Sequence, residues 1–217
     1  ASKQRADHLE HEVNHDSLTG LANRNLLWDR LEQGVHLAQR HQTKVTTVLI
    51  DLDNFKTIND TFGHDAGDAV LKVVARRLQA TVRDSDTVAR LGGDEFVLVL
   101  VDQPSLRFTL RMVERVWRAL AAPVAFNGNE IPLGASLGVS VYPHDGAQAS
   151  DLLRAADMAM YRAKGNGGGL HFFSSEMRSA SEARAALAGS MRSAIEQDEL
   201  FLLFQPRMDA RSGKVRG

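Results

Sequence analysis

Two pairs of acidic residues in this sequence each adjoin a short apolar segment, and together they could do metal chemistry. Asp51 and Asp53 stand at the end of the apolar run that begins at Val45, and Asp94 and Glu95 follow two glycines. Strands that lie side by side would bring the two pairs close together. Carboxylate oxygens are ligands that Mg²⁺ prefers, and paired ions can stabilise both sides of a phosphoryl displacement. The sequence therefore predicts a divalent-metal site, although acids at strand ends also occur in ordinary solvated turns.

The glycines that precede Asp94 favour the same chemistry. Gly92 and Gly93 can adopt positive φ angles and carry no Cβ, so the backbone there can approach a bulky phosphorylated ligand. We expect the side chains of Asp51 and Asp94 to lie at an exposed end of the strands.

The apolar periodicity predicts the elements that would hold these residues. Helical spacing predicts helices, and alternating or short continuous apolar runs predict strands. The expected helices cover 24–41, 55–62, 65–82, 106–120, 149–164 and 175–197, and the expected strands cover 45–52, 87–91, 95–101, 137–141, 170–173 and 200–206. Tight turns at 92–93 and 127–128 join neighbouring strands as hairpins. The chain is therefore expected to form an α/β fold with a mixed, mostly antiparallel central sheet flanked by helices.

The composition excludes several kinds of function. The 26 basic and 27 acidic residues leave a formal charge of −1, so no broad positive field exists that would hold a nucleic acid polymer. The apolar runs are far shorter than the roughly 20 residues that cross a bilayer, so we expect no membrane segment in this chain. The absence of cysteine excludes disulfides and thiolate chemistry. A cytoplasmic location is compatible with this composition.

The acidic turn is part of a longer pattern that resembles a known protein family. The five residues 92–96, Gly-Gly-Asp-Glu-Phe, match the signature of the GGDEF domain, the family of diguanylate cyclases. The segment 16–24 resembles the opening motif of that family, and 51–60 and 62–68 resemble its central motif, in the same order and spacing. The resemblance predicts a GGDEF domain over 16–174. It implies a palm-like fold similar to class III nucleotide cyclases and the condensation of two GTP molecules into cyclic di-GMP with release of two pyrophosphates.

The resemblance also implies roles for the acidic residues. Asp51, the backbone carbonyl of Leu52 and Asp94 would bind the metal, Mg²⁺ or Mn²⁺, with Glu95 as a second acid at the reacting centre. Asp94 and Glu95 are thus the expected catalytic residues, and both are also expected metal ligands. Glu95 could take a proton from the attacking 3′-hydroxyl or help to bind the ion that lowers the pKa of that hydroxyl, and the sequence leaves both roles open.

Two further residues, Asn59 and Asp68, match the family positions that read guanine. Guanine presents adjacent N1–H and N2–H donors that a carboxylate accepts together, and adenine lacks this pair. Without the resemblance, Asp68 would be interpreted as an acid that interacts favourably with the dipole at a helix N-terminus.

The phosphates of the nucleotide have their own candidate residues. Asn54, Phe55 and Lys56 would offer backbone amides at a helix start to the β and γ phosphates. Lys164 matches the family lysine that reaches the triphosphate, although the dipole also favours a lysine at a helix end. After this lysine the sequence departs from the family, because 164–169 lacks the usual Gly-Arg-Asn. The loss of that arginine is expected to weaken GTP binding.

Upstream of the acidic turn, Arg83 and Asp86 fit the Arg-x-x-Asp inhibitory site of the family, with Arg115 as a secondary contact. The fork of an arginine suits a phosphate and the edge of guanine, and a carboxylate can accept hydrogen bonds from guanine. Cyclic di-GMP is therefore expected to bind there and to inhibit its own synthesis. The alternative is an ordinary solvated charged turn between a helix and a strand.

The two ends of the chain indicate neighbouring segments. Residues 1–15 are interpreted as the end of an upstream signalling helix and 175–198 as a linker helix, and 199–217 resembles the truncated start of an EAL phosphodiesterase domain. The intact protein is therefore expected to be a GGDEF–EAL tandem, and it could be anchored in a membrane upstream. Its expected partners are GTP, cyclic di-GMP, a second GGDEF domain in a homodimer and the EAL domain. The alternative function is a regulatory module that binds GTP or cyclic di-GMP, makes little product and controls the EAL domain.

Overall fold

The computed structural model describes residues 13–174, 207–208 and 215–216. The chain divides into two compact units, Ala1–Arg178 and Ser179–Gly217. Within the second unit, the short strands β8 (Arg207–Met208) and β9 (Val215–Arg216) pair antiparallel. The linker helix over 175–198 and the strand over 200–206 lie outside the described residues, as do residues 1–12 of the helix expected over 1–15, of which Val13 and Asn14 are described as helical.

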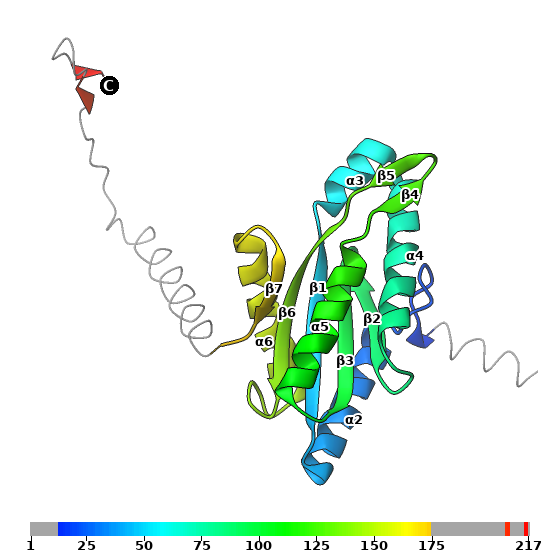
Figure 1. Ribbon diagram of the computed structural model, residues 1–217, viewed down its shortest axis with the longest axis vertical. Coiled ribbons are helices and arrows are strands. Elements are labelled where there is room, and N and C mark those ends of the chain that lie inside the picture. Colours follow the sequence, from blue (N-terminus) through cyan, green and yellow to red (C-terminus); the bar gives the residue numbers. More distant parts are fainter. Residues whose placement is uncertain (1–12, 175–206, 209–214, 217) are drawn as a thin grey trace, which may run out of the picture. The chain divides into compact units, whose positions relative to one another are not determined.

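A five-stranded sheet organises the first unit (Figure 1). Its order is β2-β3-β1-β6-β7, in which β7 runs parallel to β6 and every other neighbouring pair is antiparallel. The strands are β1 (Lys44–Asp53), β2 (Thr87–Gly92), β3 (Glu95–Gln103), β6 (Gly134–Tyr142) and β7 (Gly169–Phe172), and β4 (Val124–Phe126) and β5 (Asn129–Ile131) form a separate hairpin. The predicted mixed, mostly antiparallel α/β fold is confirmed.

Five described helices accompany the sheet. They are α2 (Arg24–His41), α3 (Phe55–Phe62), α4 (His64–Thr81), α5 (Leu106–Leu120) and α6 (Ala149–Gly165). Their bounds agree with the predicted ranges within about one residue. Within the described part of the chain, no helix is long and apolar enough to cross a membrane.

The central strand β1 contributes to two separate cores, because successive side chains of a strand point to opposite faces of the sheet. Val48 and Ile50 pack in the core that α4 and α5 cover, whereas Val45 and Leu49 pack in the core that α2 and α6 cover. Figure 1 shows α5 and α6 on opposite faces of the sheet. Asp51 follows the alternation of Val45 and Leu49, so its carboxylate lies on the face of α2 and α6.

The helix α6 lies very close to the sheet at Gly138 of β6. A Cβ on Gly138 would overlap the backbone of Ala156 and of Met160. Backbone atoms of a packed helix cannot rotate away as the end of a side chain can. Further along β6, the hydroxyl of Ser140 donates a hydrogen bond to the carbonyl of Leu152 at 2.8 Å. The small residue at 138 therefore sets how closely α6 approaches β6.

Two of the described helices, α2 and α5, have side-chain caps at their N-termini. Asn23 caps α2 by accepting hydrogen bonds from the amides of Asn25 and Leu26 at 3.0 and 3.2 Å, and Ser105 caps α5 by accepting one from the amide of Phe108 at 3.2 Å. Such caps satisfy amides that have no partner within the helix. The helix α3 has no side-chain cap, so the amides of Phe55 and Lys56 remain available to another acceptor, whereas the amide of Thr57 donates to the carbonyl of Asn54.

Candidate active site

The acidic residues predicted to meet do lie together at one end of the sheet. Asp51 of β1 pairs with Glu95 of β3 in the antiparallel register, and directly paired residues place their side chains on the same face. The amide of Leu52 donates a hydrogen bond to the carbonyl of Asp94 at 3.3 Å. The pairing of β1 with β3 therefore brings Asp51, Asp94 and Glu95 into one acidic cluster.

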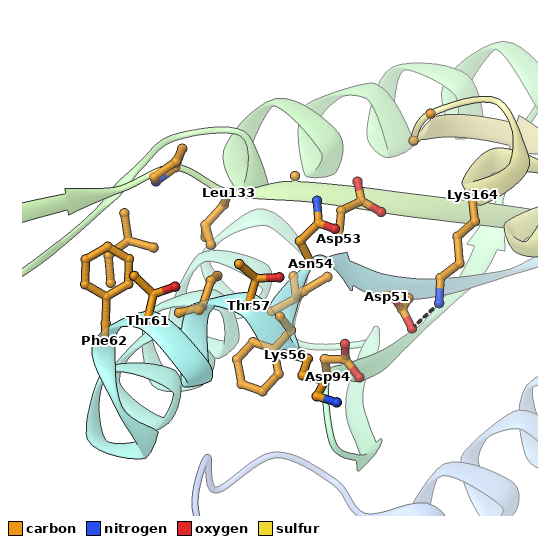
Figure 2. A pocket seen from close by; sticks show the side chains of 18 residues that line it. Asp51, Asp53, Asn54, Lys56, Thr57, Thr61, Phe62, Asp94, Leu133 and Lys164 are labelled. Atoms are coloured by element: carbon orange, nitrogen blue, oxygen red, sulfur yellow. Dashed lines mark ion pairs between the residues drawn. The ribbon is translucent and has the colours of Figure 1, made fainter.

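The expectation that Asp51 and Asp94 lie at an exposed strand end is wrong for Asp51. This residue is only 6 % exposed, because β3 and β6 flank it and a lysine of α6 closes over it. Lys164 forms an ion pair with Asp51, with 2.7 Å between Nζ and Oδ2 (Figure 2). Burial raises the pKa of Asp51, the bond from Lys164 partly offsets that effect, and the charge of Asp94 adds to it.

The acidic cluster carries more negative charge than its one lysine neutralises. Burial and the charges of Asp51, Asp94 and Asp157 raise the pKa of Glu95. Burial by itself would lower the pKa of Lys164, but its bond to Asp51 and the neighbouring carboxylates outweigh burial and raise that pKa. Lys164 therefore stays charged, and the excess of carboxylates favours the arrival of a further cation.

The cluster fits a divalent ion that shares its coordination with a substrate. No group of three or more acidic or histidine side chains in the described residues is arranged to hold a metal ion unaided. Mg²⁺ commonly binds one or two carboxylates and completes its octahedral shell with waters and substrate phosphates. Asp51, Asp94 and the backbone carbonyl of Leu52 on β1 supply the donor atoms that such a shared site needs.

A cavity of about 840 Å³ adjoins the cluster. Asp51, Asp94 and Lys164 lie at one end of it, Phe62 lies at the other, and Leu133 lies between them (Figure 2). This volume is within the range of small-molecule sites. The hollow is charged where the strands end, and along α3 apolar side chains alternate with Lys56 and two threonines.

The first turn of α3 faces this cavity. Asn54 precedes the helix with a φ of 57°, a left-handed conformation, and provides no side-chain cap. Asn54, Phe55 and Lys56 all line the cavity. Uncapped amides at a helix start, reinforced by the helix dipole, bind phosphate groups well. The structure thus places the residues predicted to bind phosphate beside the acidic cluster.

The two residues predicted to read guanine, Asn59 and Asp68, lie outside the residues that line the cavity. The amide oxygen of Asn59 lies against α4, where a Cβ on Gly67 would overlap it. Asp68 follows Gly67 on α4 and is exposed. The pair therefore flanks the junction of α3 with α4, on a different side of α3 from Thr57 and the apolar end of the cavity.

The segment after Lys164 forms a glycine turn where the family has its arginine. Gly167, Gly168 and Gly169 have φ angles of 87°, 96° and 105°, a region that favours glycine. A Cβ on Gly168 would lie 2.8 Å from Oδ2 of Asp53, whose Oδ1 accepts a hydrogen bond from Ser136 at 2.7 Å. Asp53 therefore packs against this turn, a position that its sequence alone did not indicate.

One residue that the sequence analysis missed, Arg90 of β2, supports the acidic turn. Its Nε and one terminal nitrogen donate to the carbonyl of Gly93 at 3.1 and 2.7 Å. Its other terminal nitrogen donates to both carboxylate oxygens of Asp16 at 3.1 Å. Burial by itself would raise the pKa of Asp16, but the hydrogen bonds from Thr19 and Arg90 outweigh burial and hold that pKa below its ordinary value.

The three residues of the predicted inhibitory site lie near one another, but the carboxylate of Asp86 already has backbone partners. It accepts hydrogen bonds from the amides of Arg83 and Val101, both at 3.1 Å. Burial raises the pKa of Asp86, which these bonds and the charges of Arg83 and Arg115 partly offset. Arg115 donates to the carbonyl of Thr81. The guanidinium of Arg83 lies 4.9 Å from the centre of the Phe108 ring, which leaves its fork open to a ligand.

Comparison with known proteins settles the family. A sequence model of the family described as "Diguanylate cyclase, GGDEF domain" matches residues 13–169. The chain belongs to the GGDEF family. The matched residues of this GGDEF chain include the acidic turn, the strands β1 and β3 and Lys164, so the resemblance seen in the sequence is confirmed.

Relatives of this GGDEF chain include proteins that carry out opposite reactions. It is 41 % identical over 205 residues to the bifunctional diguanylate cyclase/cyclic di-GMP phosphodiesterase MucR of Pseudomonas aeruginosa, a match over 94 % of this chain and 30 % of MucR. It is 35 % identical over 208 residues to the cyclic di-GMP phosphodiesterase NbdA of the same species, over 95 % of this chain and 26 % of NbdA. The chain thus spans less than a third of these relatives.

A solved structure shares the fold of the first unit. The GGDEF domain of TpbB from Pseudomonas aeruginosa superposes with a TM-score of 0.75 at 36 % identity, over 77 % of this chain and 99 % of that domain. The palm-like arrangement that the sequence predicted for this GGDEF chain is therefore the fold of a known GGDEF domain.

Proposed function

We propose that the GGDEF domain of this chain is a diguanylate cyclase that condenses two GTP molecules into cyclic di-GMP with release of two pyrophosphates. The observation that carries the proposal is the acidic cluster of Asp51, Asp94 and Glu95 beside the uncapped start of α3. Phosphoryl transfer needs charge stabilisation and positioning more than covalent chemistry from the protein. Amides, a lysine and metal-binding carboxylates around one cavity meet that need.

The proposed mechanism assigns one task to each group. The amides of Phe55 and Lys56 and the ammonium of Lys164 bind the β and γ phosphates of GTP. Mg²⁺ or Mn²⁺, held by Asp51, Asp94 and the carbonyl of Leu52, would supply Lewis-acid stabilisation of the reacting phosphate. Glu95 either accepts the proton of the attacking 3′-hydroxyl or helps to hold the ion. The 3′-oxygen then bonds to the α-phosphorus, and the bond to pyrophosphate breaks.

The reaction as proposed requires two copies of the domain. One chain offers one first turn of α3 and one Lys164, so it binds one triphosphate, whereas each product contains two nucleotides. A homodimer in which the two acidic clusters face each other supplies the second. Asn59 and Asp68 would select GTP by accepting the N1–H and N2–H donors of guanine, with the base at the junction of α3 and α4 and only the phosphates in the cavity.

Inhibition by the product and a downstream EAL domain are further parts of the same proposal. Cyclic di-GMP would bind at Arg83, Asp86 and Arg115 and inhibit the cyclase, with Arg83 as the main contact because its fork is open. The intact protein would be a GGDEF–EAL tandem that acts in the cytoplasm. The match to MucR covers 94 % of the chain, whereas the GGDEF family match ends at residue 169, which supports a second domain after the GGDEF domain.

A second candidate function is a regulatory module that binds GTP or cyclic di-GMP and controls the EAL domain with little turnover. The glycine turn favours it, because Gly168 stands where the family has an arginine for the triphosphate. The loss of one such charge-assisted contact costs about 1.5–3 kcal/mol of binding free energy. The match to the phosphodiesterase NbdA also agrees with a GGDEF domain in a regulatory role.

One assay separates the two functions. The chain is incubated with GTP and Mg²⁺, the product is identified by mass, and GTP binding is measured by calorimetry. Cyclic di-GMP from the wild-type chain, with none from the matched control Asp94→Asn, is the result expected of a cyclase. GTP binding without any cyclic di-GMP would overturn the cyclase proposal and favour the regulatory module.

A further inference from the structure

The exposed face of α6 carries two polar residues that the proposed mechanism does not use. Asp157, Tyr161 and Lys164 are spaced by four and three residues, so they lie along one face of the helix. Tyr161 is 65 % exposed, and Asp157 is exposed as well. Within residues 13–174, neither side chain has a hydrogen bond or an ion pair, although the charge of Asp157 acts on Glu95. A large aromatic side chain this exposed beside a charged site is available to a ligand.

The packing of α6 places this face over the acidic cluster. Leu152 of α6 lies at Ser140 of β6, Ala156 lies at Gly138, and Lys164 reaches Asp51. The helix thus runs along β6 toward the end of the sheet where the cluster lies. The ammonium of Lys164 contacts Asp51 of β1. The charge of Asp157 helps to raise the pKa of Glu95, the first residue of β3.

The acidic cluster separates Asp157 and Tyr161 of this face from the cavity, whereas Lys164 of the same face reaches into it. Asp51, Asp94 and Lys164 line the cavity, whereas Glu95, Asp157 and Tyr161 do not. In a phosphoryl transfer, the attacking and leaving oxygens lie roughly in line on opposite sides of the phosphorus. The pyrophosphate end of the bound nucleotide lies in the cavity, at the start of α3. The attacking hydroxyl must therefore arrive from the other side of the cluster, where Glu95 and Asp157 lie.

We propose that Asp157 and Tyr161 bind the attacking nucleotide, the GTP that a second copy of this chain presents. Asp157 accepts a hydrogen bond from the 2′-hydroxyl of its ribose, and the ring of Tyr161 packs against the sugar and base. The two neighbouring hydroxyls of a ribose match two neighbouring carboxylates, since Glu95 faces the 3′-hydroxyl and Asp157 the 2′-hydroxyl. This inference rests on the proposed cyclase function and adds a subsite for the second substrate.

The test measures the two nucleotides separately in the 217-residue chain. Asp157→Asn and Tyr161→Ala are compared with the wild type and with the control Arg154→Ala, an exposed residue one turn earlier on α6. Calorimetry with a GTP analogue that has a methylene between the α and β phosphates reports the nucleotide held in the cavity. The rate of cyclic di-GMP formation at saturating GTP reports the encounter of the two nucleotides.

We expect Asp157→Asn and Tyr161→Ala to bind the analogue within about twofold of the wild type but to lower the saturated rate about tenfold or more, as the loss of a charged hydrogen bond or a ring contact does. Arg154→Ala should keep the wild-type rate. Asp157→Asn should also lose most of the preference for GTP over 2′-deoxyGTP in turnover, whereas a purely structural change would slow both substrates equally.

The outcomes distinguish the two proposals. If the wild type makes cyclic di-GMP and both variants keep its rate, or lose rate and analogue binding in equal measure, the subsite is overturned and the cyclase function stands. An unchanged preference for GTP over 2′-deoxyGTP in Asp157→Asn would overturn the 2′-hydroxyl contact. If the wild type binds the analogue but makes no cyclic di-GMP, both proposals are wrong.

Discussion

Replacement of Arg90 by lysine should loosen the acidic turn without removing any charge. The guanidinium holds two acceptors at once, the carbonyl of Gly93 at 2.7 Å and the carboxylate of Asp16 at 3.1 Å. The side chains of Arg90 and Asp16 are only 11 % and 19 % exposed, so water replaces these bonds poorly. A lysine ammonium lacks the planar fork and can keep one of the two acceptors but not both.

The size of the effect follows from the bonds that are lost. A hydrogen bond to a charged group contributes about 1.5–3 kcal/mol, so the loss of one acceptor should lower the free energy of unfolding by that amount. In a domain of this size each kcal/mol changes the melting temperature by about 2–4 °C, so Arg90→Lys should melt roughly 3–12 °C below the wild type. The turn that carries Asp94 and Glu95 would also lose its support, so the rate of cyclic di-GMP formation should fall.

The pH dependence of the difference in melting temperature between wild type and Arg90→Lys gives an independent check. The pKa of Asp16 is lower in the folded chain than its ordinary value of 3.8, so the ionised carboxylate stabilises the fold at neutral pH. That contribution is present above about pH 3.8 and disappears as the pH falls through the lowered pKa. The gap between wild type and Arg90→Lys should therefore narrow in acid. Arg154→Lys serves as a surface control. If Arg90→Lys melts within about 1 °C of the wild type and forms cyclic di-GMP at an unchanged rate, this account of Arg90 is refuted.

Three other predictions concern the metal, the base and the inhibitory site. Mg²⁺ should raise the melting temperature of the wild type but not of Asp51→Asn, which should be inactive. Without metal at pH 7, Asp51→Asn should be as stable as the wild type, because the raised pKa of Asp51 means that the free energy of unfolding falls as the pH rises above the ordinary value of 3.8 and this buried carboxyl ionises. Calorimetric melting checks both points, and equal Mg²⁺ shifts in the two proteins would contradict the assignment. Asp68→Asn should weaken GTP more than inosine triphosphate, which lacks the N2 amino group, and equal losses in a binding titration would exclude the paired contact. Arg83→Ala should weaken cyclic di-GMP binding by at most several kcal/mol while the chain still binds GTP, and indistinguishable affinities would mean that Arg83 belongs to a charged turn only.

The sequence predicted the elements and the acidic cluster because both depend on local patterns. The spacing of apolar residues can be seen in the sequence of each helix by itself, and the bounds of α3 and α5 agree with the predicted ranges. The meeting of Asp51 with Glu95 needed only that their two strands be neighbours. Period-two alternation and tight turns carry that information without reference to distant residues.

The rest depends on contacts between residues far apart in the chain. Arg90 and Asp16 are 74 positions apart, and nothing in either neighbourhood indicates that one guanidinium will bridge to the acidic turn. The burial of Asp51 depends on α6 closing over β1, which no strand pattern contains. The position of Asn59 and Asp68 at the junction of α3 with α4, away from the cavity, follows from the packing of α3 against Gly67. These features are tertiary, so only the assembled structure could provide them.

The small size of Gly138 links the packing of α6 on the sheet to the geometry of the candidate active site. The residue lies in the core and meets no substrate, yet its missing methyl group decides how high α6 stands above β6. A lysine has a fixed length, so a helix lifted by the depth of one methyl group would carry Lys164 away from Asp51 and from any phosphate beside it. In a scan of variants, position 138 should therefore be scored by its effect on nucleotide binding as well as on folding. Residue 138 of β6 therefore controls how far Lys164 of α6 extends toward Asp51, and a substitution of Lys164 itself cannot reproduce that effect.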